Sequence, residues 1–212
     1  MYSNILLDNT QSFFQEPITG VDTIYNCRKY FGVTDGSYLF TDVTLKKLLN
    51  LDLSYNRFDY LIGRYECGAE QFYKTFTDAE ERLKEKPLMA MSKLTHNIMK
   101  SLNYKKIESV RKENFNYLHD ELSRYNKFKE LKTGTFMYPF MCTDAKALRK
   151  SLIASGIYIP ILWPNVIDTA DIDSNEYRHT TEILPLPIDH RYHKTEMSII
   201  ASHIKKYLSH TC

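Results

Sequence analysis

The sequence lacks the features that mark several large classes of protein. Across its 212 residues no apolar run comes near the roughly 20 residues that a membrane-spanning helix needs. The first residues, Met1 to Asp8, do not follow the basic, apolar and small-residue order of a signal peptide. Low-complexity tracts, long like-charge tracts and internal repeats are also missing. We therefore expect a chain that is folded nearly throughout, located in the cytoplasm and not bound to a membrane.

Cysteine and net charge are both low. The cysteines show no short paired spacing of the kind found in zinc sites and redox motifs, so free thiols are expected at Cys27, Cys67, Cys142 and Cys212. His190 and His193 stand three residues apart, but without an acidic or Cys partner at a suitable spacing a solvated loop is expected there, and no metal site. The formal net charge of +2, with scattered basic pairs, favours solvated helix faces over a nucleic-acid surface.

The first part of the sequence predicts three short strands followed by helices. Residues 5–7 form an apolar run that indicates a buried strand with Asp8 at its carboxyl end. Residues 23–25 indicate a second strand, which Lys29 and an Asp35-Gly36 turn follow, and residues 37–41 indicate a third. Charged and aromatic residues then predict helices with a connecting loop, most clearly over residues 69–84.

The second part predicts two more helices and then a small α/β domain. Ser92 precedes an apolar series at Leu94, Ile98 and Leu102, and a second helical stretch covers residues 107–125. A strand over 135–142, a helix opened by Thr143 or Asp144 and ended by Gly156, and a strand over 157–163 give a strand, helix, strand unit. A polar loop, a strand over 183–188 and an amphipathic helix over 195–208 follow.

Two segments resemble a known family when they are taken together. Residues 6–14 read Leu-Leu-Asp-Asn-Thr-Gln-Ser-Phe-Phe, and residues 22–41 run from Asp-Thr-Ile-Tyr-Asn-Cys-Arg-Lys to Gly-Ser-Tyr-Leu-Phe-Thr. They resemble the DegT/DnrJ group of fold type I sugar aminotransferases. In that family a strand ends in Asp, a Gln or His follows three residues on, and a later strand leads to a Lys and a Gly-containing turn. Asp8, Gln11, Lys29 and Gly36 match that order, and residues 111–122, 157–164 and 184–192 resemble later family segments.

The resemblance implies a fold class. It is α/β, with residues 1–90 as the carboxyl-terminal part of a fold type I large cofactor-binding domain and residues 91–212 as connecting helices and a small α/β domain. Family members are longer, and the amino-terminal part without a counterpart here carries most of the large-domain sheet. The resemblance therefore implies an incomplete site, weak activity of this chain alone, and a homodimer with two subunits per active site.

The resemblance also implies a role for each site residue toward pyridoxal 5'-phosphate. Lys29 would be the catalytic residue, holding the cofactor as a Schiff base and moving protons during the reaction. Asp8 would face the pyridine nitrogen and keep it protonated, and Gln11 would contact the ring or its phenolic oxygen. Asn26 would lie near the phosphate, where related members usually carry Ser. That departure leaves its role open, although an amide can donate a hydrogen bond to phosphate.

Each of these residues also has a plain structural interpretation. A single Lys is usually a surface residue, an Asp at a strand end is usually a turn or cap residue, and Arg28 is expected to form an ion pair. Trp163 before Pro164 is expected in the core or in a cleft wall. Only the joint order favours chemistry.

Two functions from different classes remain. One is an aminotransferase of nucleotide-sugar biosynthesis that moves an amino group from a donor such as glutamate to a keto-sugar nucleotide. The other is a non-catalytic remnant or split-gene partner that serves oligomerisation. Related dehydratases carry His in place of the lysine, so Lys29 argues against that activity. The sequence does not specify the sugar or the donor.

Overall fold

Short strands and surrounding helices make up the mixed α/β arrangement of this computed structural model, which describes residues 5–129 and 131–211, with Thr211 described by its backbone alone. The chain divides between Asn103 and Tyr104 into two parts, named unit 1 and unit 2. The expected domain boundary after residue 90 followed from the family resemblance and stays a prediction.

The expected free thiols are confirmed for Cys27, Cys67 and Cys142, and Cys212 lies outside the described residues. Among the described helices, none combines the length and apolarity that crossing a membrane requires.

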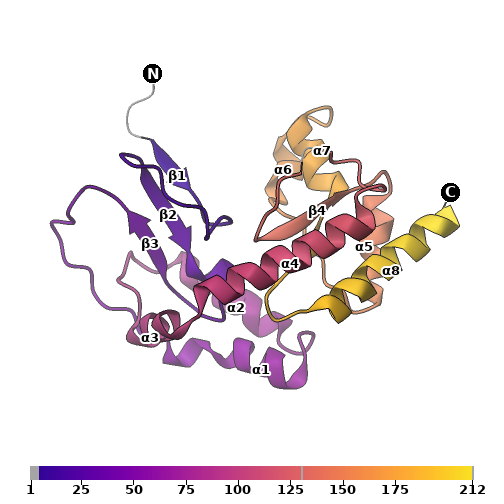
Figure 1. The fold of residues 1–212 in the computed structure, drawn as a ribbon. Coiled ribbons are helices and arrows are strands. Elements are labelled where there is room, and N and C mark those ends of the chain that lie inside the picture. Colours follow the sequence, from indigo (N-terminus) through magenta and orange to yellow (C-terminus); the bar gives the residue numbers. More distant parts are fainter. Residues whose placement is uncertain (1–4, 130, 212) are drawn as a thin grey trace. The chain divides into compact units, whose positions relative to one another are not determined.

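Unit 1 contains a three-stranded sheet in the order β1-β2-β3 (Figure 1). β1 (Leu6–Asp8) pairs in parallel with β2 (Asp22–Asn26), and β2 pairs antiparallel with β3 (Ser37–Phe40). All three predicted strands are thus confirmed, with ends that shift by a residue or so. The expected burial of the first strand is wrong, because Leu6 in β1 is exposed. β1 and β3 form the two edges of this sheet.

Helices of one to three turns complete unit 1: η1 (Cys27–Lys29), η2 (Tyr55–Arg57), α1 (Asp59–Cys67), α2 (Tyr73–Lys84) and α3 (Lys93–Ser101). The predicted helix over 69–84 begins later, at Tyr73, because Gly68 adopts a φ of 97° between α1 and α2. The Ser92 hydroxyl accepts a hydrogen bond from the Thr95 amide at 3.2 Å, which confirms Ser92 as the cap of α3.

Aromatic rings hold the segment between β1 and β2 against the sheet. The Phe13 ring lies 4.8 Å from the Phe31 ring, 5.8 Å from Tyr30 and 6.0 Å from Tyr25, measured between centroids. The contacts with Phe31 and Tyr25 are edge-on and the contact with Tyr30 is tilted, and such ring contacts add to the burial of apolar area. The polypeptide that follows Asp8 is therefore fixed by packing.

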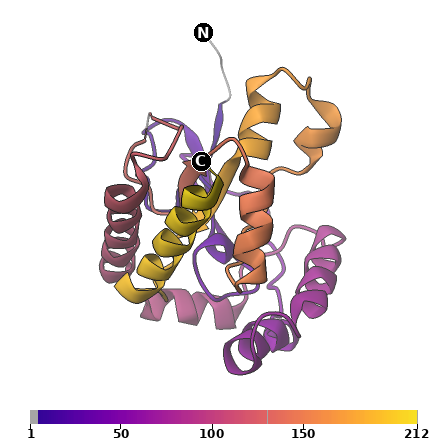
Figure 2. The ribbon, with the colours of Figure 1, turned by 90° about the vertical axis from the view of Figure 1, so that its right-hand side faces the viewer.

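Unit 2 combines a two-stranded antiparallel sheet with helices. β4 (Met137–Met141) pairs with β5 (Ile183–Pro187), and the helices are α4 (Tyr104–Leu122), α5 (Ala145–Ala154), α6 (Asn165–Thr169), α7 (Asn175–Glu182) and α8 (Lys194–Thr211). Figure 2 shows α8 beside both α4 and α5. Buried apolar side chains from these strands and helices form one core, which includes Leu118, Tyr138, Leu148, Leu186 and Ile204. The predicted strands over 135–142 and 183–188 and the helix over 195–208 are confirmed.

The predicted strand over residues 157–163 is wrong. The Ile159 carbonyl accepts a hydrogen bond from Arg149 Nε at 2.7 Å, and Pro160 has no N–H to donate to a neighbouring strand. Trp163 adopts a φ of 50° and is 56% exposed, so of the two places expected for it, the core is wrong and the cleft wall stays a prediction. β4 pairs with β5 instead, and the expected strand, helix, strand unit does not form.

The polar stretch after Pro164 is also not the expected loop, because it contains α6 and α7. The Ser174 hydroxyl caps α7 by accepting from the Tyr177 amide at 3.1 Å. Neither helix has a buried residue, so neither shows the apolar periodicity that predicts helices. The left-handed turn at Gly156 is confirmed by its φ of 78°. Asp144 precedes α5, but its Oδ2 accepts from the Tyr207 hydroxyl at 2.8 Å and it makes no capping bond.

Candidate functional site

The carboxyl ends of β1 and β2 carry two of the predicted site residues. Asp8 is the last residue of β1 and Asn26 is the last residue of β2. Because these strands are parallel, their carboxyl ends meet at one edge of the sheet, where α/β folds commonly bind ligands. Asp8 pairs with Ile24, and side chains alternate between faces along a strand. Asp8 and Asn26 therefore lie on the same face.

That shared face of the sheet is open. Its apolar members include Leu6 on β1, 60% exposed, and Leu39 on β3, which is also exposed. On the opposite face, Thr23 and Tyr25 are buried. The predicted site residues of the two strands are thus on the accessible side, and Asp8 itself is exposed.

The segment after β1 places Gln11 next to η1. The Asn9 amide donates to the Ile24 carbonyl at 2.9 Å, which extends the β1–β2 pairing by one residue. The buried Tyr30 hydroxyl donates to the Gln11 carbonyl at 2.7 Å. Gln11 is half-buried, and its backbone is tied to the residue that follows Lys29.

η1 presents Lys29 at the end of a single turn. Asn26 Oδ1 accepts a hydrogen bond from the Arg28 amide at 2.8 Å and so caps this turn, while the Asn26 amide NH2 group is the part that could donate to a ligand. Cys27 is fully buried, and burial, with the Asp35 charge as a smaller cause, raises the pKa of its thiol to about 12. Lys29 is exposed. The ion pair expected for Arg28 is present, with Glu80 of α2 as its partner.

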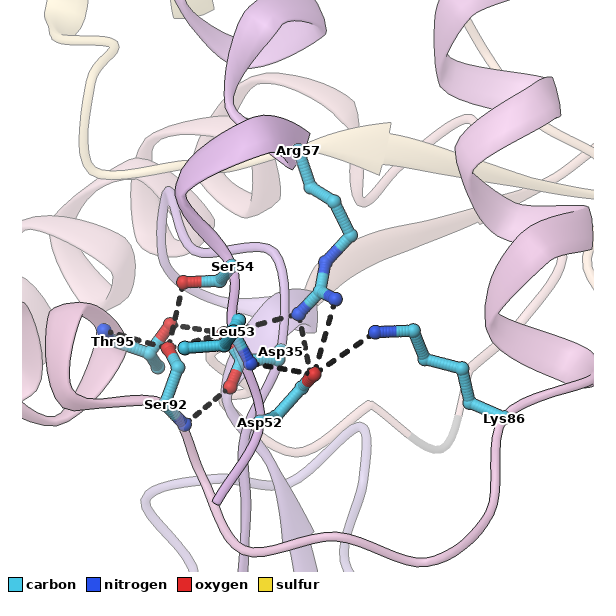
Figure 3. A network of polar contacts seen from close by, with 8 residues as sticks. All are labelled: Asp35, Asp52, Leu53, Ser54, Arg57, Lys86, Ser92 and Thr95. Atoms are coloured by element: carbon cyan, nitrogen blue, oxygen red, sulfur yellow. Dashed lines mark hydrogen bonds and ion pairs between the residues drawn. The ribbon is translucent and has the colours of Figure 1, made fainter. Parts of the chain in front are cut away.

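The side chain of Asp35, in the turn that follows η1, is hydrogen-bonded to residues at the start of α3 (Figure 3). The Cys27 amide donates to the Gly36 carbonyl at 3.1 Å. Asp35 Oδ2 accepts from the Ser92 amide at 2.7 Å, and Asp35 Oδ1 accepts from the Ser92 hydroxyl at 3.0 Å and from the Thr95 hydroxyl. The turn after Lys29 is therefore held by a buried carboxylate.

A second buried carboxylate, Asp52, continues this network. Arg57 Nη2 lies 2.5 Å from Asp52 Oδ2 and 3.9 Å from Asp35 Oδ1, and Lys86 Nζ lies 2.9 Å from Asp52 Oδ1. Figure 3 shows these groups converging from three separate segments. Sequence analysis missed the network, because no spacing signal connects partners so far apart in the chain.

Comparison with known proteins supports the fold. No family model and no curated protein sequence matches this chain. Among solved structures, the chain is similar to a DegT DnrJ EryC1 StrS aminotransferase from Brucella abortus, with a TM-score of 0.56 and 14% sequence identity over 96% of this chain. The fold is aminotransferase-like. This chain covers 57% of the Brucella protein's chain, so the activity, substrates and partners of a whole aminotransferase are proposals here.

The site prediction can be followed only as far as placement. Asp8 and Asn26 end β1 and β2 at one sheet edge and share a face, and Gln11 and Lys29 lie three residues after them in the chain. Their roles toward a cofactor stay predictions. Of the histidines His190 and His193, the first has a partner within the protein, because Arg111 Nε lies 3.3 Å from His190 Nδ1. Within the described ranges, no three His, Cys, Asp or Glu side chains gather where a metal ion could bind.

Proposed function

We propose that this chain is an aminotransferase-like protein that binds pyridoxal 5'-phosphate and acts on a keto-sugar nucleotide, with an amino donor such as glutamate. The observation that carries the proposal is the placement of Asp8 at the end of β1 and of Lys29 at the end of η1, which directly follows the adjacent parallel strand β2, with Asp8 on the open face of the sheet. The aminotransferase-like fold agrees with it.

The side chains at this edge match the cofactor in chemical kind. A carboxylate suits a protonated ring nitrogen, and Asp8 uses only Oδ1 for its recorded bond, accepting from the Thr10 amide at 2.9 Å. The Gln11 and Asn26 amides can donate to the ring oxygen or the phosphate. Lys29 supplies an exposed primary amine, which is the group that attaches to an aldehyde.

These residues divide the chemistry among them. When bound, pyridoxal phosphate provides an electron-withdrawing ring that stabilises negative charge on the reacting carbon. Lys29 Nζ removes the proton from that carbon and returns a proton during the transfer. Asp8 keeps the ring nitrogen protonated, and Gln11 and Asn26 orient the ring and its phosphate.

Unit 1 needs further walls before this site can exclude water. Among the described residues, unit 1 carries 17 exposed large hydrophobic side chains and 8 buried hydrophobic ones, whereas unit 2 carries 6 and 20. Perturbed pKa values at catalytic groups depend on a desolvated pocket. We therefore propose that the active form is a homodimer with a more complete large domain, and that residues 1–212 alone are weakly active.

Cofactor attachment tests the proposal directly. We expect pyridoxal phosphate added to the chain to give a visible absorbance band and, after borohydride reduction, a covalent label on Lys29 that peptide mass spectrometry locates. Lys29→Ala should lose both signals, whereas Lys47→Ala, an exposed lysine after β3, should keep them. Equal labelling of many surface lysines, or an unchanged band in Lys29→Ala, would contradict the proposal.

A specific observation favours the second candidate function, a non-catalytic association protein. Leu45 and Leu48, in the segment after β3, are 66% and 96% exposed, and such apolar surface commonly marks protein interfaces. This function predicts a stable oligomer without cofactor uptake. Sedimentation velocity with and without pyridoxal phosphate separates the two, and Leu48→Lys should weaken association in both cases.

A further inference from the structure

The side chain beside Lys29 joins three elements of unit 1. Arg28 is the middle residue of η1, and its side chain is only 23% exposed. Its Nη2 pairs with Glu80 Oε1 on α2. The guanidinium also acts on Tyr60 of α1: burial raises the pKa of the Tyr60 hydroxyl, and the Arg28 charge opposes that rise. One side chain thus pairs η1 with α2 and acts electrostatically on α1.

The two partners of Arg28 are themselves firmly placed. Tyr60 is buried, and its ring centroid lies 5.6 Å from that of Phe76 on α2. α1 and α2 pack against each other. The bridge therefore reaches a helix pair that is held by its own apolar contacts, and the pair does not depend on η1 for its packing.

η1 has little stability of its own. It is one turn of three residues, with Cys27 O accepting from the Tyr30 amide at 3.2 Å and from the Phe31 amide at 3.0 Å. Single turns of this kind form only when side chains anchor them. The Asn26 cap fixes the start of the turn, and the buried Cys27 and Tyr30 hold it against the rest of the sheet. Arg28 is the side chain of the turn that ties it to α2.

We propose that Arg28 is a positioning residue for Lys29: by pairing with Glu80 on α2, it fixes the direction in which the Lys29 amine leaves η1. The inference rests on the proposed function of Lys29. A guanidinium is suited to the task because its planar fork presents several N–H groups in fixed directions, whereas a Lys ammonium is a single point charge.

The experiment compares four single variants in the full chain. Arg28→Met removes the ion pair with Glu80, Glu80→Gln removes the charge of its partner, and Tyr60→Phe removes the hydroxyl on which the Arg28 charge acts. Asp78→Asn is the matched control, because Asp78 lies on the same helix as Glu80 and pairs only with Lys74 in the recorded ion pairs. Two quantities are measured: the borohydride-trapped rate of pyridoxal phosphate attachment to Lys29 as a function of pH, and amide hydrogen exchange of the peptide that contains η1.

We expect Arg28→Met to slow attachment at Lys29 by about fivefold, the value of a partly exposed ion pair, and to shift the pH profile of attachment. Hydrogen exchange should become faster at η1 while α1 and α2 keep their protection. Glu80→Gln and Tyr60→Phe should show smaller effects in the same direction, and Asp78→Asn should match the original chain. Arg28→Lys should restore only part of the rate, and the exchanged pair Arg28→Glu with Glu80→Arg should recover more than either change alone.

The outcomes separate this inference from the proposed function. Attachment in Arg28→Met with the original rate and pH profile would overturn the positioning role. If Lys29 is not labelled even in the original chain, the proposed function fails, and unchanged exchange at η1 in Arg28→Met would then overturn the anchoring as well. If Arg28→Met does not fold, Glu80→Gln, which keeps the shape of the side chain, decides by the same two measurements.

Discussion

At the scale of single residues, Asp52 shows how charge stabilises unit 1. Burial by itself raises the pKa of Asp52, but the hydrogen bonds from Arg57 and Lys86 and the Arg57 charge together hold it below the ordinary value of 3.8. A carboxyl whose pKa is lower in the folded state stabilises the fold at pH values above its ordinary pKa. That contribution is lost as the pH falls through the folded pKa.

Asp52→Asn should therefore lower the free energy of unfolding by about 1.5–3 kcal/mol at neutral pH, the range for hydrogen bonds to charged groups. The difference between the two proteins should shrink below pH 3.8, where the original carboxyl also becomes protonated. Urea unfolding followed by circular dichroism at several pH values measures both effects. Asp78→Asn, which removes an exposed partner, should change the free energy by less than about 0.5 kcal/mol.

The residues of the site differ in how far the sequence could predict them. The order of Asp8, Gln11 and Lys29 is local, so a sequence motif can reveal it. Asp35 could not be found that way, because its partners Ser92 and Thr95 come from a distant segment and only folding brings them together. The Glu80 partner of Arg28 was unpredictable for the same reason, although an ion pair was expected.

At the scale of elements, Gly36 decides how closely β3 can begin beside α3. Its φ is 99°, and a Cβ there would lie 2.9 Å from Met91 Cε and 3.0 Å from Thr95 Cγ2. Gly20 also has a positive φ, 77°, but a Cβ at that position would meet nothing within 4 Å. Alanine substitutions at Gly36 and Gly20 therefore distinguish the cost of backbone strain from the cost of steric crowding.

Gly36→Ala should destabilise unit 1 by about 1–3 kcal/mol from the backbone conformation, with a further loss from the crowding. Gly20→Ala should show the backbone cost alone. Thermal unfolding of the two variants measures the difference, and equal midpoints would show that Met91 and Thr95 move aside freely.

Elements with strong local signals were predictable and the others were not. The three strands of unit 1, α3 with its Ser92 cap, and α8 with its apolar face follow from pattern alone. The stretch over 157–163 carries the β-forming residues of a strand, but a side-chain donor and a proline leave it outside the sheet. α6 has only five residues and α7 is almost entirely polar, so no apolar periodicity could reveal them.

At the scale of the whole molecule, the two units differ in how they bury apolar surface. Unit 2 has a continuous core, whereas unit 1 leaves much of its apolar surface accessible. Because stability depends mainly on buried apolar area, we expect unit 2 to be the more stable. Native-state hydrogen exchange of the full chain should show the slowest amides on α4, β4 and β5, and faster exchange on β1 and β3. Slower exchange in the unit 1 sheet would contradict this expectation.

The likeness in overall fold was predictable from the family resemblance and not from composition. The Brucella structure shares the fold at 14% identity, so physical requirements of packing are kept where most residues differ. The substrate, the donor and the dimer could not be derived in this way, because a shared fold does not specify them.

The buried thiol of Cys27 can serve as a natural probe of local unfolding in unit 1. A thiol with a pKa of about 12 has almost no thiolate at neutral pH, so an alkylating reagent reaches it only when the turn beside Lys29 unfolds. Cys67 is exposed, so its alkylation provides an internal standard for reagent activity. Cys142 is buried, so its rate of alkylation measures local unfolding in unit 2. Timed alkylation with peptide mass spectrometry could therefore follow local breathing at the site without any engineered probe.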